Sequence, residues 1–493
     1  MAFEDIGEYI EKLRDEGVLF EVNAEVNWDL EIGGVVDRLN KTYPADLPPV
    51  LFNSIRGYPN WRFFVNGFAG PTAQSIAMGL PRTTGIRKLI DVFRERVKHP
   101  IKPKTTRKDA EFKEIKLTGD DVNLLEIPAP KWHYMDGGRY LGTWHAVITK
   151  DPENGWMNLG MYRIMLHDRK TLGIMINPRN HGMIHLRKYI EAGEPMPVAI
   201  SIGHDELISA ACAEAFPYGQ SEYDIAGALR QEAVKIVDCE TSDLKVPLSS
   251  QLVIEGEVSF DDLKPEGPFG EWTGYYGGET ALRPVIKVKC ITYREDPIFR
   301  GSYLSTPPCE NHTLWALTKS AMIKHHLDTV GMPGIRDVYV HPSTGATLIA
   351  VSIEQSYPQH GREVGEAILA SKYAQFSKMV IVTNEDINVT DLGEILWAVH
   401  WRSQPEEWVV LRKKPGSVLD PSVPVEWRGF TSKILIDATW PWNPDFPPVN
   451  QWNNRRYPPT IQVDEKTRKT VDEKWSSYGL GGNRFSDVFR NVW

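Results

Sequence analysis

The chain has 493 residues, of which 41% are hydrophobic and 25% are charged, and its formal net charge is −9. This length predicts two or three globular domains. The acidic balance argues against a general binder of nucleic acid or of anionic membranes, because both need a basic surface. We expect no signal peptide and no membrane span, because no basic segment precedes an apolar one and no run of 18 apolar residues occurs. The four cysteines are widely spaced, as is typical of reduced thiols in a cytoplasmic protein.

The first 115 residues are predicted to form an α/β region. Apolar side chains repeat with the spacing of one helical face at Ile6, Tyr9, Ile10 and Leu13. Gly17 is a typical helix stop. Strands are expected at 18–22, 49–55 and 62–68. A second helix is expected from residue 84 until just before Pro100.

The region 116–310 is dominated by runs of β-branched residues bounded by Gly, Pro, Asn or Asp, which favour strands. These runs lie at 144–150, 161–168, 170–176, 197–203, 252–260 and 284–293. Two helices are expected among them, at 183–193 and 205–215. The pattern indicates an antiparallel barrel or sandwich.

A linking helix is predicted within 311–335, and a third domain within 336–460. Strand and helix patterns alternate there, with strands expected at 346–354, 378–387 and 407–411. This βαβαβ order predicts a parallel sheet with crossover helices. The stretch 436–452, rich in Pro and Trp, is not expected to form regular structure, and a tail helix is predicted within 461–493. No Gly-x-Gly-x-x-Gly follows a strand, so a dinucleotide fingerprint is missing.

The segment EGPFGEWTGYYGG places Glu266 and Glu271 five residues apart. Pro268 and the glycines favour a turn, which lets both carboxylates point to one place. Nearby carboxylates repel when both are ionised, so one pKa rises, and a carboxyl of raised pKa is a usable acid or base near neutral pH. A solvated acidic turn is the alternative.

Arg163 alternates with apolar residues in a run that reads as a strand. An inward-facing arginine needs an anionic partner, and its planar guanidinium can hold a substrate carboxylate through two hydrogen bonds. A structural salt bridge, with Glu266 as a candidate partner, explains the pattern equally well.

Asn158, His181 and Glu222 carry side chains that can bind metals, but their separations of 23 and 41 residues match no short metal motif. Structural or solvated roles are the alternative. The loop NPRNHGMIH, which contains Asn180, is rich in Gly, Pro and Asn and suits close packing against a ligand, or an ordinary connection.

Five segments occur in one order along the chain: NLGMYR, SEYDIAGALR, EGPFGEWTGYYGG, KMVIVTNEDINVTDLGEILWAVHWRSQPE and IDATWPW. Together they resemble the UbiD family of decarboxylases. The resemblance implies an N-terminal α/β region, a central split β-barrel that binds flavin, and a C-terminal α/β domain used for oligomerisation. It also implies a prenylated FMN cofactor, made by a flavin prenyltransferase, and a homodimer or homohexamer.

The resemblance implies specific site residues. The catalytic network is Arg163, Glu266 and Glu271, with Arg163 orienting the carboxylate and Glu271 donating the proton. Asn158, His181 and Glu222 are implied ligands of Mn²⁺ or Mg²⁺, which bridges to the cofactor phosphate. A K⁺ site lies close by, with Arg402 near it. Residues expected around the cofactor are Asn158, Gly160, Met161, Arg163, Asn180, His181, Glu222, Trp272 and Lys372, the last near the phosphate.

Three positions depart from the family pattern or vary within it. Gly160 stands where relatives can carry a hydroxyl, and Asn180 replaces the glutamine of ferulic acid decarboxylases. Trp272 stands where a smaller side chain is frequent, and an indole there favours a planar aromatic substrate by stacking.

The expected reaction is the reversible decarboxylation of a small aromatic or heteroaromatic acid, with release of CO₂. The alternative within the family is the 4-hydroxy-3-polyprenylbenzoate decarboxylase of quinone biosynthesis, which needs a pocket open to a long tail. Alternatives of other classes are a metal-dependent hydrolase and a flavin oxidoreductase.

Overall fold

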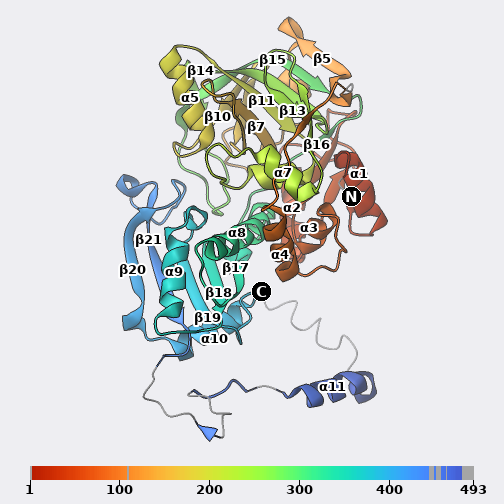
Figure 1. Ribbon diagram of the computed structural model, residues 1–493. Coiled ribbons are helices and arrows are strands. Elements are labelled where there is room, and N and C mark those ends of the chain that lie inside the picture. The colour runs from red at the N-terminus through yellow and green to blue at the C-terminus, as the bar shows by residue number, and fades with distance from the viewer. Residues whose placement is uncertain (1–2, 108–109, 443–448, 451–456, 462, 480–493) are drawn as a thin grey trace. The chain divides into compact units, whose positions relative to one another are not determined.

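The computed structural model describes residues 3–107, 110–442, 449–450, 457–461 and 463–479. The chain divides into two compact units, residues 1–439 and 440–493. The first unit holds all four β-sheets (Figure 1). None of the described helices is long and apolar enough to span a membrane.

The N-terminal region carries a four-stranded sheet in the order β1-β2-β3-β16. Its strands are β1 (Phe20–Val22), β2 (Val50–Phe52), β3 (Arg62–Val65) and β16 (Ile298–Arg300). The helices are α1 (Ile6–Asp15), α2 (Glu31–Thr42), α3 (Pro71–Ala77) and α4 (Ile86–Arg96). Because β16 comes from the end of the central region and pairs in parallel with β3, the first two regions are joined through one sheet.

The predicted face of α1 is confirmed, because Ile6, Tyr9, Ile10 and Leu13 are all buried. Asp5 caps this helix by accepting a hydrogen bond from the Glu8 N–H. The next helix, α4, lies within the predicted stretch and ends at Arg96, before Pro100 as predicted. Helix α2 was not predicted, because its Gly33–Gly34 pair lowers helix propensity.

The central region is built on a nine-stranded sheet in the order β6-β9-β10-β15-β14-β11-β7-β8, with β5 paired to β15. Every neighbouring pair is antiparallel, as predicted. The sheet curls (Figure 1), and its described path ends at β6 and β8 without closing. The strands are β5 (Ile115–Thr118), β6 (Arg139–Gly142), β7 (His145–Lys150), β8 (Met157–Gly160), β9 (Ile164–Asp168), β10 (Thr171–Ile174), β11 (Met196–Ile202), β14 (Leu252–Glu266) and β15 (Ala281–Tyr293).

Three helices interrupt this sheet: α5 (His181–Ala192), α6 (Glu206–Cys212) and α7 (Glu222–Arg230). Helix α5 begins two residues before the prediction and α6 ends before it, at Cys212. Helix α7 was not predicted. It contains Gly227, where an added Cβ would lie 2.4 Å from the Ile101 carbonyl oxygen. Close packing therefore requires glycine at this position, and glycine lowers the helix propensity of the sequence.

A small three-stranded sheet lies in the order β13-β12-β4. Its strands are β4 (Lys104–Thr105), β12 (Lys235–Asp238) and β13 (Lys245–Pro247). Strand β4 precedes the boundary predicted near residue 115, yet it pairs with β12 of the central region. The connection between the two regions therefore takes part in the central fold.

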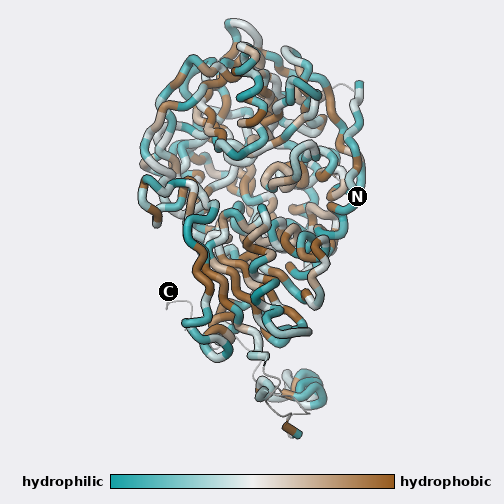
Figure 2. Tube along the Cα trace, turned by 60° about the vertical axis from the view of Figure 1, so that its left-hand side comes forward, coloured by the Kyte–Doolittle hydropathy of each residue, from teal (hydrophilic) through white to brown (hydrophobic). Residues whose placement is uncertain are grey.

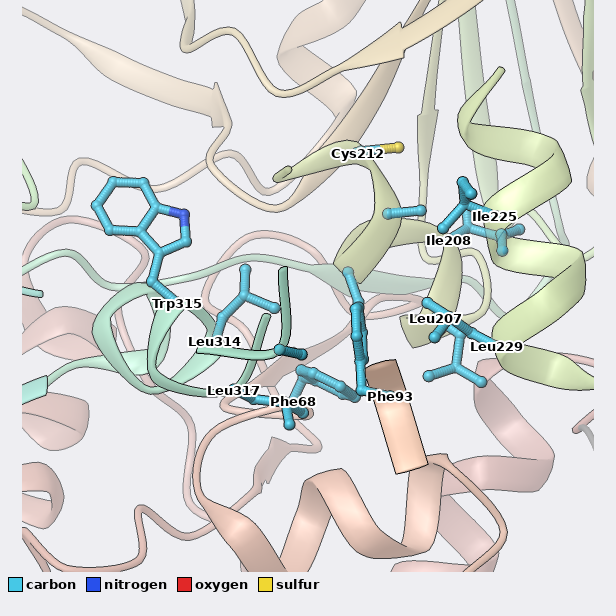
Figure 3. Close-up of a cluster of buried hydrophobic side chains, with 14 of the residues drawn as sticks. Phe68, Phe93, Leu207, Ile208, Cys212, Ile225, Leu229, Leu314, Trp315 and Leu317 are labelled. Carbon is cyan, nitrogen blue, oxygen red and sulfur yellow. The ribbon is translucent and has the colours of Figure 1, made fainter. Parts of the chain in front are cut away.

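The predicted linking helix is α8 (Glu310–Thr329). It contacts α4, strand β17 (Ile335–Val340) and helix α9 (His360–Ala370), so it lies between the N-terminal and C-terminal regions. Figure 3 shows Leu314 and Leu317 of α8 beside Phe68 and Phe93, while Trp315 points away from them. The same apolar cluster continues to Leu207 and Ile208 of α6 and to Ile225 and Leu229 of α7.

The C-terminal region has a five-stranded sheet in the order β17-β18-β19-β21-β20. Its other strands are β18 (Leu348–Ile353), β19 (Met379–Asn384), β20 (Val409–Pro415) and β21 (Phe430–Ala438). Strands β18, β19 and β21 are parallel. The prediction that the run at 407–411 joins the parallel set is wrong, because β20 pairs antiparallel with β21. The stretch 436–452 was predicted to be irregular, but its first three residues complete β21.

Alternate residues of the three parallel strands face opposite layers, because side chains alternate across a strand. Ile349, Val380 and Leu435 pack with α8 and α9. Leu348, Ile381 and Ile436 pack with α10 (Leu392–Arg402). These strands are the most continuously hydrophobic part of the chain (Figure 2), which is typical of a parallel sheet covered on both faces.

The second unit contains α11 (Glu465–Lys474) followed by a short 3₁₀ turn, Trp475–Tyr478. This confirms the predicted tail helix. Part of the Pro- and Trp-rich stretch, at 443–448 and 451–452, lies outside the described residues.

Candidate active site

A cavity of about 340 Å³ lies in the first unit between the central sheet, α5, α7, α8 and two segments of the C-terminal region. Its size is within the usual range for ligand sites. The structure brings to its wall most of the residues predicted for the site: Asn158, Gly160, Met161, Arg163, Asn180, His181, Glu222, Glu271, Trp272 and Lys372. Glu266 lies behind Arg163, and Arg402 is not part of this wall.

Arg163 is held between the two glutamates of the acidic segment. Its Nε and Nη2 donate to Oε1 and Oε2 of Glu266 at 2.9 and 2.8 Å, and its Nη1 donates to Oε1 of Glu271 at 2.5 Å. The prediction that Arg163 lies in a strand is wrong, because it falls in the break between β8 and β9. Leaving the strand frees its side chain to reach the cavity.

Glu266 is the last residue of β14, and the segment then turns sharply. Gly267 has a φ of 89°, and a Cβ there would lie 3.4 Å from Nη2 of Arg163. Gly277 returns close to the site, where an added Cβ would lie 2.5 Å from Cγ of Glu271. The Glu271 N–H donates to the Tyr275 carbonyl, and the Gly277 N–H donates to the Phe269 carbonyl. The turn thus places Glu271 opposite Glu266, on the other side of the guanidinium.

Both carboxylates are buried, so the alternative of a solvated acidic turn is wrong. Burial raises the pKa of Glu271, and the attraction of Arg163 only partly offsets this. Burial lowers the pKa of Arg163, but Glu271 and Glu266 outweigh it and raise that pKa. A permanently charged guanidinium therefore lies against a carboxyl group that takes up a proton more readily than usual.

Tyr140 of β6 completes this network, and the sequence analysis missed it. Its hydroxyl donates to Oε1 of Glu266 at 2.9 Å, and its ring lies 4.0 Å from that of Phe269 between centroids. Burial, and then the charge of Glu266, raise the pKa of Tyr140, which keeps the hydroxyl protonated as a donor. Glu266 thus accepts three hydrogen bonds, and these hold it in place as the partner of Arg163.

The candidate metal ligands come from β8 and from the first residues of two helices. Asn158 lies in β8, His181 begins α5 and Glu222 begins α7. Oε2 of Glu222 accepts the Leu159 N–H at 2.8 Å, and burial raises the pKa of Glu222 to about 8. Burial, then the nearby Lys372, lower the pKa of His181, so its imidazole is neutral and able to bind a metal. Within the described part of the chain, no group of three His, Cys, Asp or Glu residues is placed to hold a metal ion. The predicted set does not form such a group, because its third member is an asparagine.

Tyr162 explains why a glycine stands at position 160. An added Cβ at Gly160 would lie 2.4 Å from the Tyr162 hydroxyl, which fills the space beside it. That hydroxyl accepts the Gly182 N–H at 3.2 Å and lies 3.4 Å from Nδ2 of Asn158. Tyr162 therefore ties β8 to the start of α5, next to Asn180 and His181.

Trp272 forms one wall of the cavity with two aromatic residues that the sequence analysis missed. Its ring lies edge-on to Trp315 at 5.0 Å and tilted against Phe376 at 5.7 Å, between centroids. The Lys319 ammonium lies 4.7 Å from the centroid of Trp315. Asn311, Trp315 and Lys319 recur every four residues and all line the cavity. Residues four apart lie on the same face of a helix, so this spacing is the feature of the sequence that could have predicted these three residues.

Lys372 and Glu214 line another part of the cavity, and each has a polar atom without a hydrogen-bond partner in the described chain. Burial lowers the pKa of Lys372 to about 8, and its ammonium makes no hydrogen bond to any described residue. Oε2 of Glu214 is buried and has no hydrogen-bond partner in the described chain. A lysine ammonium without a hydrogen-bond partner, beside neutral imidazole and amide groups, suits a bound phosphate with a cation. The residues present therefore fit a phosphorylated cofactor and a divalent metal.

Arg402 lies apart from this cavity. It ends α10, and its guanidinium donates two hydrogen bonds to Asp386 at 2.8 and 2.7 Å. It also lies 5.5 Å from the centroid of Trp397. The structure does not bring Arg402 to the wall formed by the other predicted residues.

Comparison with known proteins follows the same division of the chain. Three family models match: the 3-octaprenyl-4-hydroxybenzoate carboxy-lyase N-terminal domain at residues 10–93, the Rift-related domain at 104–307 and the C-terminal domain at 312–438. A phenolic acid decarboxylase of Bacillus subtilis (strain 168) is 32% identical, over 90% of this chain and 94% of the relative.

Two solved structures resemble most of the chain. The vanillic acid decarboxylase of Sedimentibacter hydroxybenzoicus in its closed form has a TM-score of 0.85 at 29% identity, covering 98% of this chain and 100% of that one. An evolved dimeric form of the UbiD-class enzyme HmfF from Pelotomaculum thermopropionicum, in complex with prFMN, has a TM-score of 0.78 at 25% identity, covering 94% and 98%. The chain therefore belongs to the UbiD family of carboxy-lyases, which confirms the family and the reaction class predicted from its sequence.

Proposed function

We propose that this protein catalyses the reversible, non-oxidative decarboxylation of a small aromatic or heteroaromatic carboxylic acid with prenylated FMN as cofactor. The observation that carries the proposal is the partly buried guanidinium of Arg163, bound by Glu266 and Glu271 in the wall of a cavity. The relatives that act on phenolic and vanillic acids and the prFMN complex of HmfF support the substrate class and the cofactor.

The cofactor, when bound, supplies an electron sink for the bond that loses CO₂. Arg163 orients the substrate carboxylate, because a planar guanidinium fixed by Glu266 presents its remaining N–H groups in one direction. Glu271 then delivers the proton that replaces CO₂ at the same carbon. Its raised pKa favours the protonated form that this step needs.

The cofactor phosphate is proposed to lie beside Lys372, at the starts of α5 and α7. Helix N-termini present free N–H groups and a positive end to a phosphate. Asn158, His181 and Glu222 would hold Mn²⁺ or Mg²⁺ at that phosphate, and metal binding would draw Glu222 into its ionised form. K⁺ beside this site stays a prediction, and the pairing of Arg402 with Asp386 gives it no support.

Several finer features are proposed on the family resemblance. They are the split-barrel topology of the central sheet, the domain bounds 1–115, 116–310, 311–335, 336–460 and 461–493, the homodimer or homohexamer, the flavin prenyltransferase that supplies the cofactor, and the cytoplasmic location. The curled antiparallel sheet supports the first of these.

The aromatic wall supports a compact substrate over one with a polyprenyl tail. Trp272, Trp315 and Phe376 contact one another and close one side of a cavity of about 340 Å³. A flat ring can stack on such a wall, since aromatic groups pair with offset or edge-on geometry.

The test is to express the chain with and without a flavin prenyltransferase, and then to screen aromatic acids for CO₂ release. We expect a bound flavin with altered visible absorption and CO₂ release only after co-expression. Hydrolase activity without bound flavin would favour the metal-dependent hydrolase, and hydride transfer from a nicotinamide would favour the oxidoreductase. Either result would overturn the proposal.

A further inference from the structure

His312 is a fully buried histidine that links helix α8 to the turn carrying Glu271. Its Nε2 lies 2.5 Å from the carbonyl oxygen of Trp272, the residue that directly follows Glu271. Its Nδ1 lies 3.0 Å from the backbone nitrogen of Cys309, the N-cap of α8. Both ring nitrogens thus have a partner, and Trp272 lies 40 residues before His312 in the chain.

These two contacts determine the position of the imidazole proton. The Cys309 partner is an N–H, which can only donate, so Nδ1 must be the unprotonated acceptor. The Trp272 partner is a carbonyl, which can only accept, so Nε2 must carry the proton. In this arrangement the histidine donates to Trp272 through Nε2 and accepts from the Cys309 N–H through Nδ1.

The carbonyl of Trp272 belongs to the tight turn that positions Glu271. Within this turn the Glu271 N–H donates to the Tyr275 carbonyl at 3.0 Å, and the Gly274 N–H donates to the Glu271 carbonyl at 2.9 Å. Gly274 has a φ of 79°, and an added Cβ would lie 3.2 Å from Cα of Thr306, in the segment leading into α8. His312 is the side chain that joins these two segments by a hydrogen bond.

We propose that His312 is a positioning residue, which holds the Glu271 turn against the start of α8 so that Glu271 and Trp272 keep their places in the cavity wall. The proposal rests on the proposed function, in which Glu271 is the proton donor. A displacement of a catalytic group by about 1 Å can lower the rate by about 10²-fold.

The competing explanation is that His312 only caps α8. His312 occupies the third position of that helix. Its ring accepts a hydrogen bond from the backbone N–H of Cys309, and its backbone N–H donates to the Cys309 sulfur. This is a reciprocal capping pattern. A cap alone would need Nδ1 and not Nε2. The two roles therefore depend on different ring atoms and can be separated by substitution.

The matched variants are His312→Asn and His312→Gln. Asparagine places an acceptor where Nδ1 is and can cap α8, but it is too short to reach Trp272. Glutamine, a usual residue at this capping position, also extends an N–H₂ donor to where Nε2 is. Both variants can cap the helix, and only glutamine restores the link to the turn.

Each variant is prepared as holoenzyme with prenylated FMN, and kcat and KM for CO₂ release are measured. Hydrogen exchange of the peptides covering 269–278 is recorded beside them. We expect His312→Asn to lose about 10²-fold in kcat with KM changed less than about threefold, and its amides at 271–277 to exchange at least tenfold faster. We expect His312→Gln to recover most of both properties.

Wild-type kcat and exchange in His312→Asn would overturn the proposal, and so would equal losses in both variants. The exchange experiment needs no turnover. If the wild-type protein released no CO₂ from any acid, the proposed function would fail while faster exchange confined to His312→Asn would still support the link.

Discussion

Replacing Glu271 by glutamine tests the role of this residue as proton donor, because it removes the acidic proton and keeps the shape. Arg163 would stay in place, since its two hydrogen bonds to Glu266 at 2.9 and 2.8 Å do not involve position 271. The amide oxygen can still accept from Nη1. The substitution therefore removes the acidic proton, while the carboxylate-binding group is preserved.

The expected loss is that of a general acid, about 10² to 10⁴-fold in kcat. Each tenfold change is worth 1.36 kcal/mol, so the barrier should rise by about 3 to 5 kcal/mol. KM should change little, because Arg163 is intact. Affinity for FMN, measured by quenching of flavin fluorescence in the metal-loaded protein, should be unchanged.

The pH dependence gives a second measure of the same group. Burial raises the pKa of Glu271, so its acidic form persists above the usual titration range of a glutamate and is lost as the pH rises through this higher pKa. We expect the wild-type kcat for decarboxylation to fall along that limb, and the residual rate of Glu271→Gln to lack it. A glutamine variant with a rate within tenfold of wild type, or with the same alkaline limb, would refute the assignment.

Arg163→Lys should lower kcat/KM by at least about 10²-fold, because an ammonium cannot keep the bidentate contact to Glu266. Circular dichroism should show an unchanged fold. A smaller loss would argue that Arg163 does not bind the substrate carboxylate. Gly277→Ala should lower kcat about 10 to 100-fold, since its Cβ would lie 2.5 Å from Cγ of Glu271, and a wild-type rate would show that the turn yields freely. His181→Ala should lose bound Mn²⁺ and FMN on dialysis against chelator, measured by metal analysis and flavin absorbance, while full retention would count against its role as a ligand.

The contacts that make the site are mostly long-range, which limits what a single sequence can reveal. Arg163 and Glu266 are 103 residues apart, and nothing in their local patterns indicates that they meet. The spacing of Glu266 and Glu271 is equally consistent with a solvated turn. The resemblance to a family joined these segments, and the structure then showed which atoms pair.

The parts that were missed have physical reasons. Helices α2 and α7 carry glycines that lower helix propensity but allow close packing elsewhere. Phe376 and Leu419 reach the cavity only because the C-terminal region folds against the central one, and no periodic signal marks such contacts. The pairing of β20 with β21 similarly depends on the hairpin register and not on the strand pattern of 407–411.

A second cluster of the same composition shows what makes the first one a site. Arg300 is bound by Glu206 and Glu310, with Nε 2.7 Å from Oε1 of Glu206 and Nη2 against Oε1 of Glu310 at 2.5 Å. Its guanidinium also lies 4.6 Å from the centroid of Trp144. None of its three charged members lines the cavity, and the Arg300 side chain is only 1% exposed.

The two clusters therefore have the same residue types and differ in whether the cavity reaches them. Arg300 joins β16, α6 and the first residue of α8, and a buried ion network of this kind serves to connect segments. The Arg163 side chain is 10% exposed and, with Glu271, opens onto the cavity. An arginine between two glutamates thus becomes a candidate catalytic group only where a cavity reaches it, which a sequence pattern alone cannot tell. Here the turn from Glu266 to Gly278 brings one of the two glutamates to that surface and leaves the other behind the guanidinium.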